Sequence, residues 1–227
     1  MSKSKLITLV IAIVLVVGML VMFYGETIFT SQTAEGPGPD PSLNEVEYSC
    51  QPGDFPFEND HLPAVLICIA GYGVIVTELY PEYAPITVAN FIDLVDRGFY
   101  DGLTLHRIME GFMMQGGCPY GQGIGNSGEF ITGEFAANGH NNPIHHERGV
   151  LSMARQGHDM NSASSQFFII DGEAWWLDNE FAGFGRVIYG MEVVDRITTN
   201  SNPIDDNGTI RPAEQPVISE MRVWNRP

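Results

Sequence analysis

The chain has 227 residues, of which 44% are hydrophobic, so it is long enough to form one or two globular domains with a full core. Its 28 acidic residues outnumber 11 basic ones and give a formal net charge of −17 at pH 7. This charge argues against binding to nucleic acid or to anionic lipid headgroups.

The first 24 residues differ from the rest of the chain. Residues 6–24 form an uncharged, apolar run of nineteen residues, which is long enough to cross a bilayer. Lys3 and Lys5 precede the run, so the positive-inside rule predicts a cytoplasmic N-terminus and export of the remainder to the periplasm or another extracytoplasmic space. No small-x-small cleavage site closely follows, which favours a single-pass signal anchor over the alternative, a cleaved leader. The exported part holds nine arginines and 28 acidic residues, a net charge of −19.

Residues 25–60 are rich in Pro, Gly, Ser, Thr, Glu and Asp, a composition typical of a flexible linker, and residues 61–227 are expected to form the folded domain. The three cysteines are Cys50, Cys68 and Cys118. An exported domain permits disulfides, but three cysteines leave the pairing open. Cys68 lies within an apolar strand pattern, where a simply buried thiol is expected.

The folded part is expected to be mainly β. Apolar runs bounded by turn residues predict strands, and an i, i+3, i+4, i+7 pattern predicts a helix that begins at Pro85 and stops at Gly98. A second, short helix is expected at 191–198. Many short strands without a βαβ rhythm favour a closed antiparallel barrel capped by the helices. The strands are expected at 64–70, 74–79, 103–108, 112–115, 150–153, 166–170, 185–189 and 217–223.

A long segment at 116–149 shows little strand pattern and is expected to be a functional or mobile loop. Its Gly123-Ile-Gly-Asn-Ser-Gly128 matches a nucleotide-binding pattern, but no helix follows it, so a glycine-permitted loop is favoured. His140, His145, His146 and Glu147 raise the possibility of a metal site; adjacent histidines in an extended loop point apart, so a surface loop is expected instead. Farther along, Asn207-Gly-Thr209 matches a glycosylation sequon and equally a plain turn.

A group of side chains in the predicted strands and tight turns suggests a binding site. The apolar residues Phe112, Met113, Phe168 and Leu177 accompany polar ones, Arg107, Gln115 and Gln166. An arginine among apolar neighbours must reach solvent or a ligand. Ser152, Ser164 and Ser165 lie in no nucleophile motif, which argues against a hydrolase. One fixed cation beside an apolar wall suits a reaction that breaks no covalent bond.

From about Val65 to Val223 the chain resembles a cyclophilin, a peptidyl-prolyl cis-trans isomerase, in its bacterial exported form. The resemblance implies an eight-stranded antiparallel barrel closed by two helices, with a peptide groove on its outer face, no cofactor and no metal. It is carried, in family order, by 84–91 (APITVANF), 98–102 (GFYDG), 106–108 (HRI), 111–117 (GFMMQGG), 151–155 (LSMAR), 161–169 (NSASSQFFI), 176–178 (WLD) and 184–185 (FG).

Matched motif by motif, the resemblance implies that Arg107 is the catalytic arginine and that Gln115 orients it. It implies a substrate-binding set made of Phe112, Met113, Ala154, Arg155, Gln166, Phe168, Trp176, Leu177 and Phe181. Phe112, Met113, Phe168 and Leu177 correspond to the proline pocket, the backbone of Ala154 and Arg155 to a peptide contact, and Trp176 to the border of the groove. Two positions depart from the common pattern. Arg155 stands where eukaryotic members usually have asparagine, and Phe181 where a pocket histidine is common, which puts affinity for cyclosporin-type ligands in doubt.

Three functions follow for a domain expected to be monomeric. The first is an isomerase that assists the folding of exported, proline-containing polypeptides. The second is a catalytically weak module that binds proline-containing segments. The third is a domain whose main role is its placement at the membrane through residues 6–24. The presence of Arg107, Phe112, Gln115 and Phe168 favours the enzyme.

Overall fold

The computed structural model describes residues 61–224, and the predicted span, the predicted linker and Cys50 lie outside the described residues. Within residues 61–224 no helix is long and apolar enough to cross a membrane. In chain order the elements are β1 (Ala64–Ile69), β2 (Gly73–Leu79), α2 (Pro85–Asp96), β3 (Arg107–Met109), β4 (Met113–Gly116), η2 (Ala136–Asn138), β5 (Val150–Met153), β6 (Phe167–Ile170), η3 (Trp175–Leu177), β7 (Ala182–Tyr189), α3 (Met191–Asn200), η4 (Pro212–Glu214) and β8 (Ile218–Trp224).

All eight strands belong to one antiparallel sheet in the order β3-β4-β6-β5-β7-β2-β1-β8. Its two edge strands, β3 and β8, do not pair along a ladder. Instead, an isolated bridge joins Thr104 to Val217, and the Leu105 N–H donates to the Pro216 carbonyl at 2.9 Å. Pro216 has no N–H to return, so regular pairing stops there. The fold is therefore a mainly β half-barrel, and the expected strand at 103–108 is wrong before Arg107.

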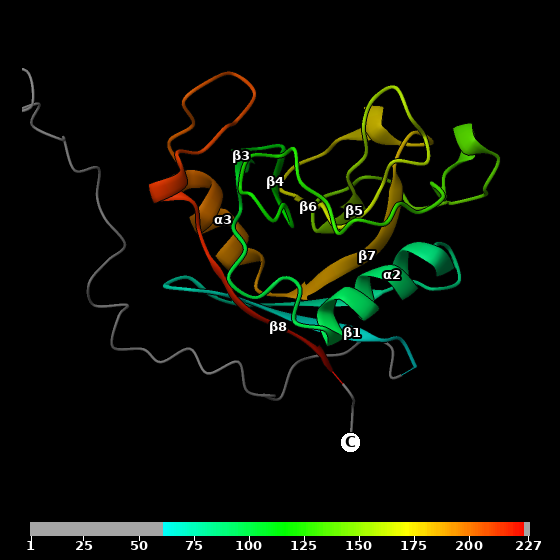
Figure 1. The fold of residues 1–227 in the computed structure, drawn as a ribbon, viewed down its shortest axis with the longest axis horizontal. Coiled ribbons are helices and arrows are strands. Elements are labelled where there is room, and N and C mark those ends of the chain that lie inside the picture. The colour runs from blue at the N-terminus through cyan, green and yellow to red at the C-terminus, as the bar shows by residue number, and fades with distance from the viewer. Residues whose placement is uncertain (1–60, 225–227) are drawn as a thin grey trace, which may run out of the picture. The chain divides into compact units, whose positions relative to one another are not determined.

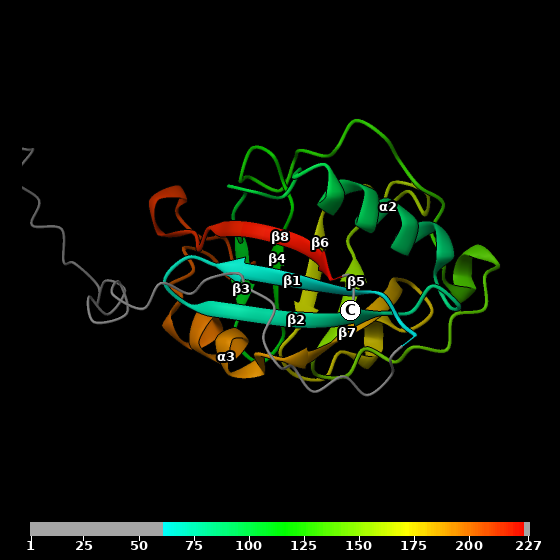
Figure 2. The same ribbon diagram turned by 90° about the horizontal axis from the view of Figure 1, so that it is seen from below.

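The two helices lie at opposite ends of the sheet (Figures 1 and 2), where α2 contacts β8 and β7 while α3 contacts β2 and β4. Pro85 opens α2, and the chain leaves the helix through Gly98, whose φ of +64° suits a residue without a Cβ. The buried carboxylate of Glu134 accepts from the N–H groups of Ile86 at 2.9 Å and Thr87 at 2.8 Å. These two bonds satisfy orphan donors at the start of α2.

The main core fills the interior between the sheet and both helices. Phe91 of α2 lies at its centre, with ring centroids 5.3 Å from Tyr100, 5.5 Å from Phe167 and 5.0 Å from Phe184. The Tyr100 hydroxyl donates to a backbone carbonyl, that of Ser165, at 3.0 Å. The one polar atom of the Tyr100 side chain is therefore satisfied within the packed core.

Strands β4 and β6 carry apolar side chains on both faces, and this produces a second core. Side chains alternate along a strand. Met114 and Phe167 point into the main core, whereas Met113, Phe168 and Ile170 belong to a separate apolar cluster. That second cluster supplies the wall of the site described next.

Candidate active site

Five residues of the second cluster correspond to the expected binding residues, namely Phe112, Met113, Phe168, Leu177 and Phe181. We call these five residues the apolar recess. Met113 lies in β4 and Phe168 in the adjoining strand β6, and the two residues are 1% and 5% exposed. The Phe168 ring meets Phe181 edge to face at 6.0 Å, and Phe112 packs against the exposed Trp176 at 5.4 Å. The structure therefore brings together six of the predicted residues, all of them apolar or aromatic.

Arg107 begins β3 and lies beside this recess, with its guanidinium carbon 5.9 Å from the Phe112 ring centroid. Its Nη1 donates to Gln115 Oε1 at 3.2 Å and lies 3.9 Å from Met113 Sδ, and its Nη2 lies 3.4 Å from Met109 Sδ. Partial burial lowers the pKa of Arg107, and the nearby carboxylate of Asp205 counteracts the effect. The side chain remains a cation at neutral pH, because an arginine pKa starts far above that range.

A chain of side-chain amides holds Gln115 in place. Gln115 Nε2 donates to Gln166 Oε1 at 2.9 Å, and Gln166 Nε2 donates to the carbonyls of Gly123 and Gly125 at 2.8 and 2.7 Å. Because two carbonyls occupy the Gln166 donor group, its oxygen must face Gln115. The Gln115 oxygen in turn must face Arg107.

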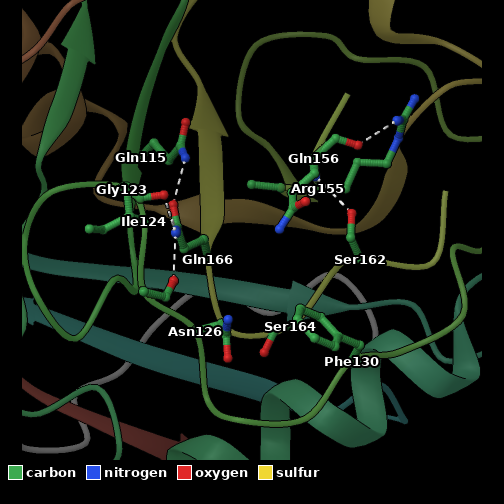
Figure 3. A pocket seen from close by; sticks show the side chains of 12 residues that line it. Gln115, Gly123, Ile124, Asn126, Phe130, Arg155, Gln156, Ser162, Ser164 and Gln166 are labelled. Atoms are coloured by element: carbon green, nitrogen blue, oxygen red, sulfur yellow. Dashed lines mark hydrogen bonds between the residues drawn. The ribbon is translucent and has the colours of Figure 1, made fainter. Parts of the chain in front are cut away.

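A pocket of about 350 Å³ adjoins the amide chain. Figure 3 shows Gln115 and Gln166 on one side and Arg155 and Ser162 on the other. Phe130 completes the wall, and Ala154 is part of the lining. The Ala154 N–H donates to the Gln166 carbonyl at 2.9 Å, which fixes this end of β5 against β6. Ala154 also packs against the second apolar cluster, so the pocket borders the recess.

The Arg155 side chain turns away from solvent and is only 6% exposed. Its guanidinium carbon lies 4.7 Å from the Phe181 ring centroid and 5.2 Å from that of Phe135. Its Nη2 also pairs with the Glu180 carboxylate at 3.0 Å. Arg155 therefore stacks on Phe181, which occupies the position of the common pocket histidine.

The expectation of a surface loop is wrong for His146, which is fully buried behind the recess. Its Nδ1 hydrogen-bonds Asp178 Oδ1 at 2.8 Å, its Nε2 hydrogen-bonds Ser152 Oγ at 2.9 Å, and its ring stacks on Phe168. Burial lowers the pKa of His146, although the Asp178 carboxylate acts in the opposite direction. Ser152 is itself fully buried, so this Ser–His–Asp arrangement cannot reach a substrate carbonyl and serves packing.

His145 is exposed, and its Nδ1 hydrogen-bonds the second oxygen of Asp178 at 2.7 Å, an interaction that raises the pKa of His145. The described residues contain no group of three His, Cys, Asp or Glu side chains able to hold a metal ion. His145 and His146 thus share the carboxylate of Asp178. No local sequence pattern indicated this contact, because Asp178 lies 33 and 32 residues downstream of them.

Two further residues of the site escaped the sequence analysis. His106 precedes Arg107 and is 5% exposed, and neither ring nitrogen has a hydrogen-bond partner among residues 61–224. Burial lowers the pKa of His106 to about 4, and the Arg107 charge adds to the effect. The backbone of Asn207 also contributes, since its carbonyl accepts from Arg107 Nε at 2.7 Å. Only the HRI motif and the Asn-Gly turn hinted at these positions.

The expectation for Cys68 is also corrected. Cys68 is buried but it is disulfide-bonded, whereas Cys118 is a free, buried thiol. The partner of Cys68 therefore lies outside the described residues.

Comparison with known proteins gives a consistent result. The sequence model of the family described as "Cyclophilin type peptidyl-prolyl cis-trans isomerase/CLD" matches residues 64–223. "Peptidyl-prolyl cis-trans isomerase B" of Bacillus subtilis (strain 168) is 50% identical over 115 residues, which are 51% of this chain and 76% of that protein. "Peptidyl-prolyl cis-trans isomerase-like 1" of Mus musculus is 44% identical over 140 residues, 59% of this chain and 82% of that protein.

Among solved structures, a cyclophilin-type peptidyl-prolyl cis-trans isomerase of Cryptosporidium parvum aligns with a TM-score of 0.65 and 28% identity, over 74% of this chain and all of that one. A second structure of that protein, determined in the presence of the dipeptide Ala-Pro, aligns with a TM-score of 0.63. It covers 72% of this chain and 99% of that chain, at 28% identity.

Proposed function

This chain belongs to the cyclophilin family of peptidyl-prolyl cis-trans isomerases and is such an isomerase, and we propose that Arg107 and the apolar recess perform the reaction on exported polypeptides from a membrane tether. The observation that carries the proposal is the juxtaposition of one guanidinium with a recess that is apolar throughout. In this proposal a proline ring that fills the recess has its imide nitrogen next to the Arg107 guanidinium.

The chemistry follows from the X-Pro bond. Its partial double-bond character sets a barrier of about 20 kcal/mol, and rotation by a right angle breaks the conjugation and leaves a lone pair on the proline nitrogen. A guanidinium N–H aimed at that nitrogen forms a hydrogen bond that exists only in the rotated state, which is the differential stabilisation that catalysis needs. The apolar recess holds the pyrrolidine ring and excludes water, which strengthens this bond. No bond is made or broken, so the reaction requires no cofactor.

The remaining residues have supporting roles in this proposal. Gln115 holds the guanidinium plane, and Gln166 holds Gln115. The backbone of Ala154 and Arg155 beside the pocket pairs with an extended peptide through groups other than the Ala154 N–H, which already donates to Gln166, and Trp176 packs next to Phe112. A proline-containing polypeptide is thus gripped at its ring and along its backbone.

The test is the exchange rate between cis and trans forms of a short X-Pro peptide, measured by NMR with the full-length chain in mild detergent. Acceleration that disappears in Arg107→Ala while peptide binding persists supports the assignment. A wild-type chain that binds the peptide without accelerating exchange would instead support the alternative, a proline-binding module.

The location of the enzyme is the second part of the proposal. Residues 1–24 anchor the chain with a cytoplasmic N-terminus, residues 25–60 form the linker, and residues 61–227 work as a monomer outside the cytoplasm. The lysines before the apolar run support this orientation. The disulfide at Cys68 supports an oxidising compartment, and Cys50 is the cysteine left to pair with it.

Two measurements test the location. Protease added to intact spheroplasts should digest the isomerase domain while leaving a cytoplasmic control protein whole, and the enzyme should sediment with membranes. Thiol titration of the denatured chain without reductant should yield one thiol, and with reductant three. A domain protected from protease, or three thiols without reductant, would refute export.

A further inference from the structure

We propose that Asp205 is a positioning residue for the reaction, because it builds the turn at 205–209 whose backbone holds the Arg107 guanidinium. This inference rests on the proposed role of Arg107 and adds a component that no sequence motif indicated. The turn lies between α3 and η4, about a hundred residues from Arg107 along the chain.

The turn makes the shortest hydrogen bond that the guanidinium has. Arg107 Nε donates to the Asn207 carbonyl at 2.7 Å, compared with 3.2 Å from Nη1 to Gln115. A planar guanidinium held at Nε on one side and at Nη1 on another has its plane and its depth determined. Among the described residues, Nη2 has only the Met109 sulfur, at 3.4 Å. A thioether is a weak acceptor, so Nη2 keeps N–H groups available for a substrate.

The turn is docked firmly on β3. The Ile108 N–H donates to the Gly208 carbonyl at 2.8 Å, and Arg107 forms an isolated bridge with Thr209. Gly208 has a φ of +83°, and a Cβ placed on it would lie 2.4 Å from Met109 Cγ and 2.7 Å from the Ile108 carbonyl. Only glycine allows this approach, so the position of the Asn207 carbonyl depends on the turn retaining its shape.

Asp205 is the residue that gives the turn its shape. Its Oδ1 accepts from the N–H of Asn207 at 3.1 Å and from that of Thr209 at 3.0 Å, and its carbonyl accepts from Gly208 at 3.1 Å. A carboxylate that accepts from the backbone two residues ahead is a standard means of closing a turn. Those bonds, and the Arg107 charge, lower the pKa of Asp205.

The neighbouring Asp206 provides a matched control. It has the same side chain and is exposed like Asp205, yet it makes no hydrogen bond or ion pair in the part of the chain that the structure describes. Asp205→Ala and Asp206→Ala therefore remove the same charge from the same turn, and only the first removes the two backbone contacts. Asp205→Asn keeps an Oδ1 acceptor and removes the charge.

The experiment measures kcat and KM for an X-Pro peptide with the full-length chain in detergent. We expect Asp205→Ala to lower kcat about tenfold with KM changed by less than about twofold, since displacement of a catalytic group by about an ångström costs one to two orders of magnitude. We expect Asp206→Ala to match the wild type and Asp205→Asn to keep most of the activity. Gly208→Ala, which displaces the turn in a different way, should resemble Asp205→Ala.

A spectroscopic readout separates positioning from general stability. The Nε–H proton of Arg107, identified by its loss in Arg107→Lys, should exchange slowly with water in the wild type and in Asp206→Ala, and faster in Asp205→Ala. Equal kcat for Asp205→Ala and the wild type, or equal losses in Asp205→Ala and Asp206→Ala, would overturn the inference while leaving the role of Arg107 intact. Full activity of Arg107→Ala would overturn that role itself.

Discussion

The Nη1 group of Arg107 donates to the Oε1 atom of Gln115, its direct partner across the β3–β4 ladder, at 3.2 Å. The donors then run in one direction, from Arg107 to Gln115, from Gln115 to Gln166, and from Gln166 to the carbonyls at Gly123 and Gly125. A cation therefore lies at the head of a chain that ends in fixed backbone. This arrangement restrains the guanidinium and leaves its charge in place. A carboxylate partner would neutralise that charge.

Replacement of Arg107 tests the head of this chain. We expect Arg107→Ala to lower turnover by roughly 10²–10³, as for loss of an oxyanion-stabilising donor. Arg107→Lys should also be poor, because an ammonium cannot keep the planar contacts with Asn207 and Gln115 while donating to a substrate. The measurement is kcat in the exchange assay, with thermal unfolding to check the fold. Wild-type turnover in either variant would contradict the mechanism.

Replacement of Gln166 tests the other end of this chain of hydrogen bonds. A glutamate there has no donor for the carbonyls of Gly123 and Gly125, so Gln166→Glu should release Gln115 and lower kcat by about one order of magnitude. Gln122→Glu adds the same charge at an exposed position of the same loop and should leave kcat unchanged. If the two variants lose activity equally, the added charge and not the amide chain is responsible.

The pH dependence of turnover follows from the groups at the recess. Arg107 stays charged, and His106, whose pKa is lowered to about 4, stays neutral at higher pH. Turnover should therefore be nearly flat between about pH 6 and 9, because arginine does not deprotonate in that range. A steep step within this interval, measured with the wild-type chain, would point to a different catalytic group.

Glu134 is a structural rather than a catalytic residue, and its removal should cost stability. Its carboxylate accepts from two N–H groups at the start of α2, and Glu134→Ala would remove the partner of both, including the buried N–H of Thr87. The expected loss is about 1–3 kcal/mol of unfolding free energy. Urea unfolding measures it, with Glu129→Ala as the exposed control. A loss no larger than that of the control would show that Glu134 does not cap the helix.

The parts of the fold with local signals were predictable from the sequence. The apolar runs around the Gly71–Gly73 turn placed β1 and β2 within one residue of their bounds, and Pro85 with the i, i+3, i+4 pattern placed α2. The strand at 103–108 failed because its partner contains Pro216, whose effect on a distant pairing has no local signal. For the same reason the sheet does not close into the regular barrel that was expected.

The site was predictable where a motif marks it. Resemblance to the family supplied Arg107, Gln115 and the recess residues, and the structure brings these together, while their roles await the substitutions above. The contact between His146 and Asp178 spans 32 residues and follows no periodicity. The Asn207 contribution comes from a backbone carbonyl, which no side-chain pattern can reveal.

The stability of the domain should fall on mild acidification, because His106 and His146 are buried with lowered pKa values. An unfolded histidine takes up a proton near pH 6.5, whereas folded His106 does so only near about pH 4. Between these values the unfolded state binds more protons, so the free energy of unfolding decreases as pH falls. The His106 contribution amounts to about 3 kcal/mol across that window. Exposed His145, whose pKa is raised, acts with the opposite sign.

Urea unfolding between pH 7.5 and 4.5 measures this slope. His106→Gln removes the titrating ring while keeping a polar side chain of similar reach, and it should flatten much of the dependence. His158→Gln, at an exposed position, should leave the dependence unchanged. If His106→Gln retains the full wild-type slope, the acid sensitivity arises elsewhere, and the buried imidazole next to Arg107 must be protonated in the folded state more easily than its burial implies.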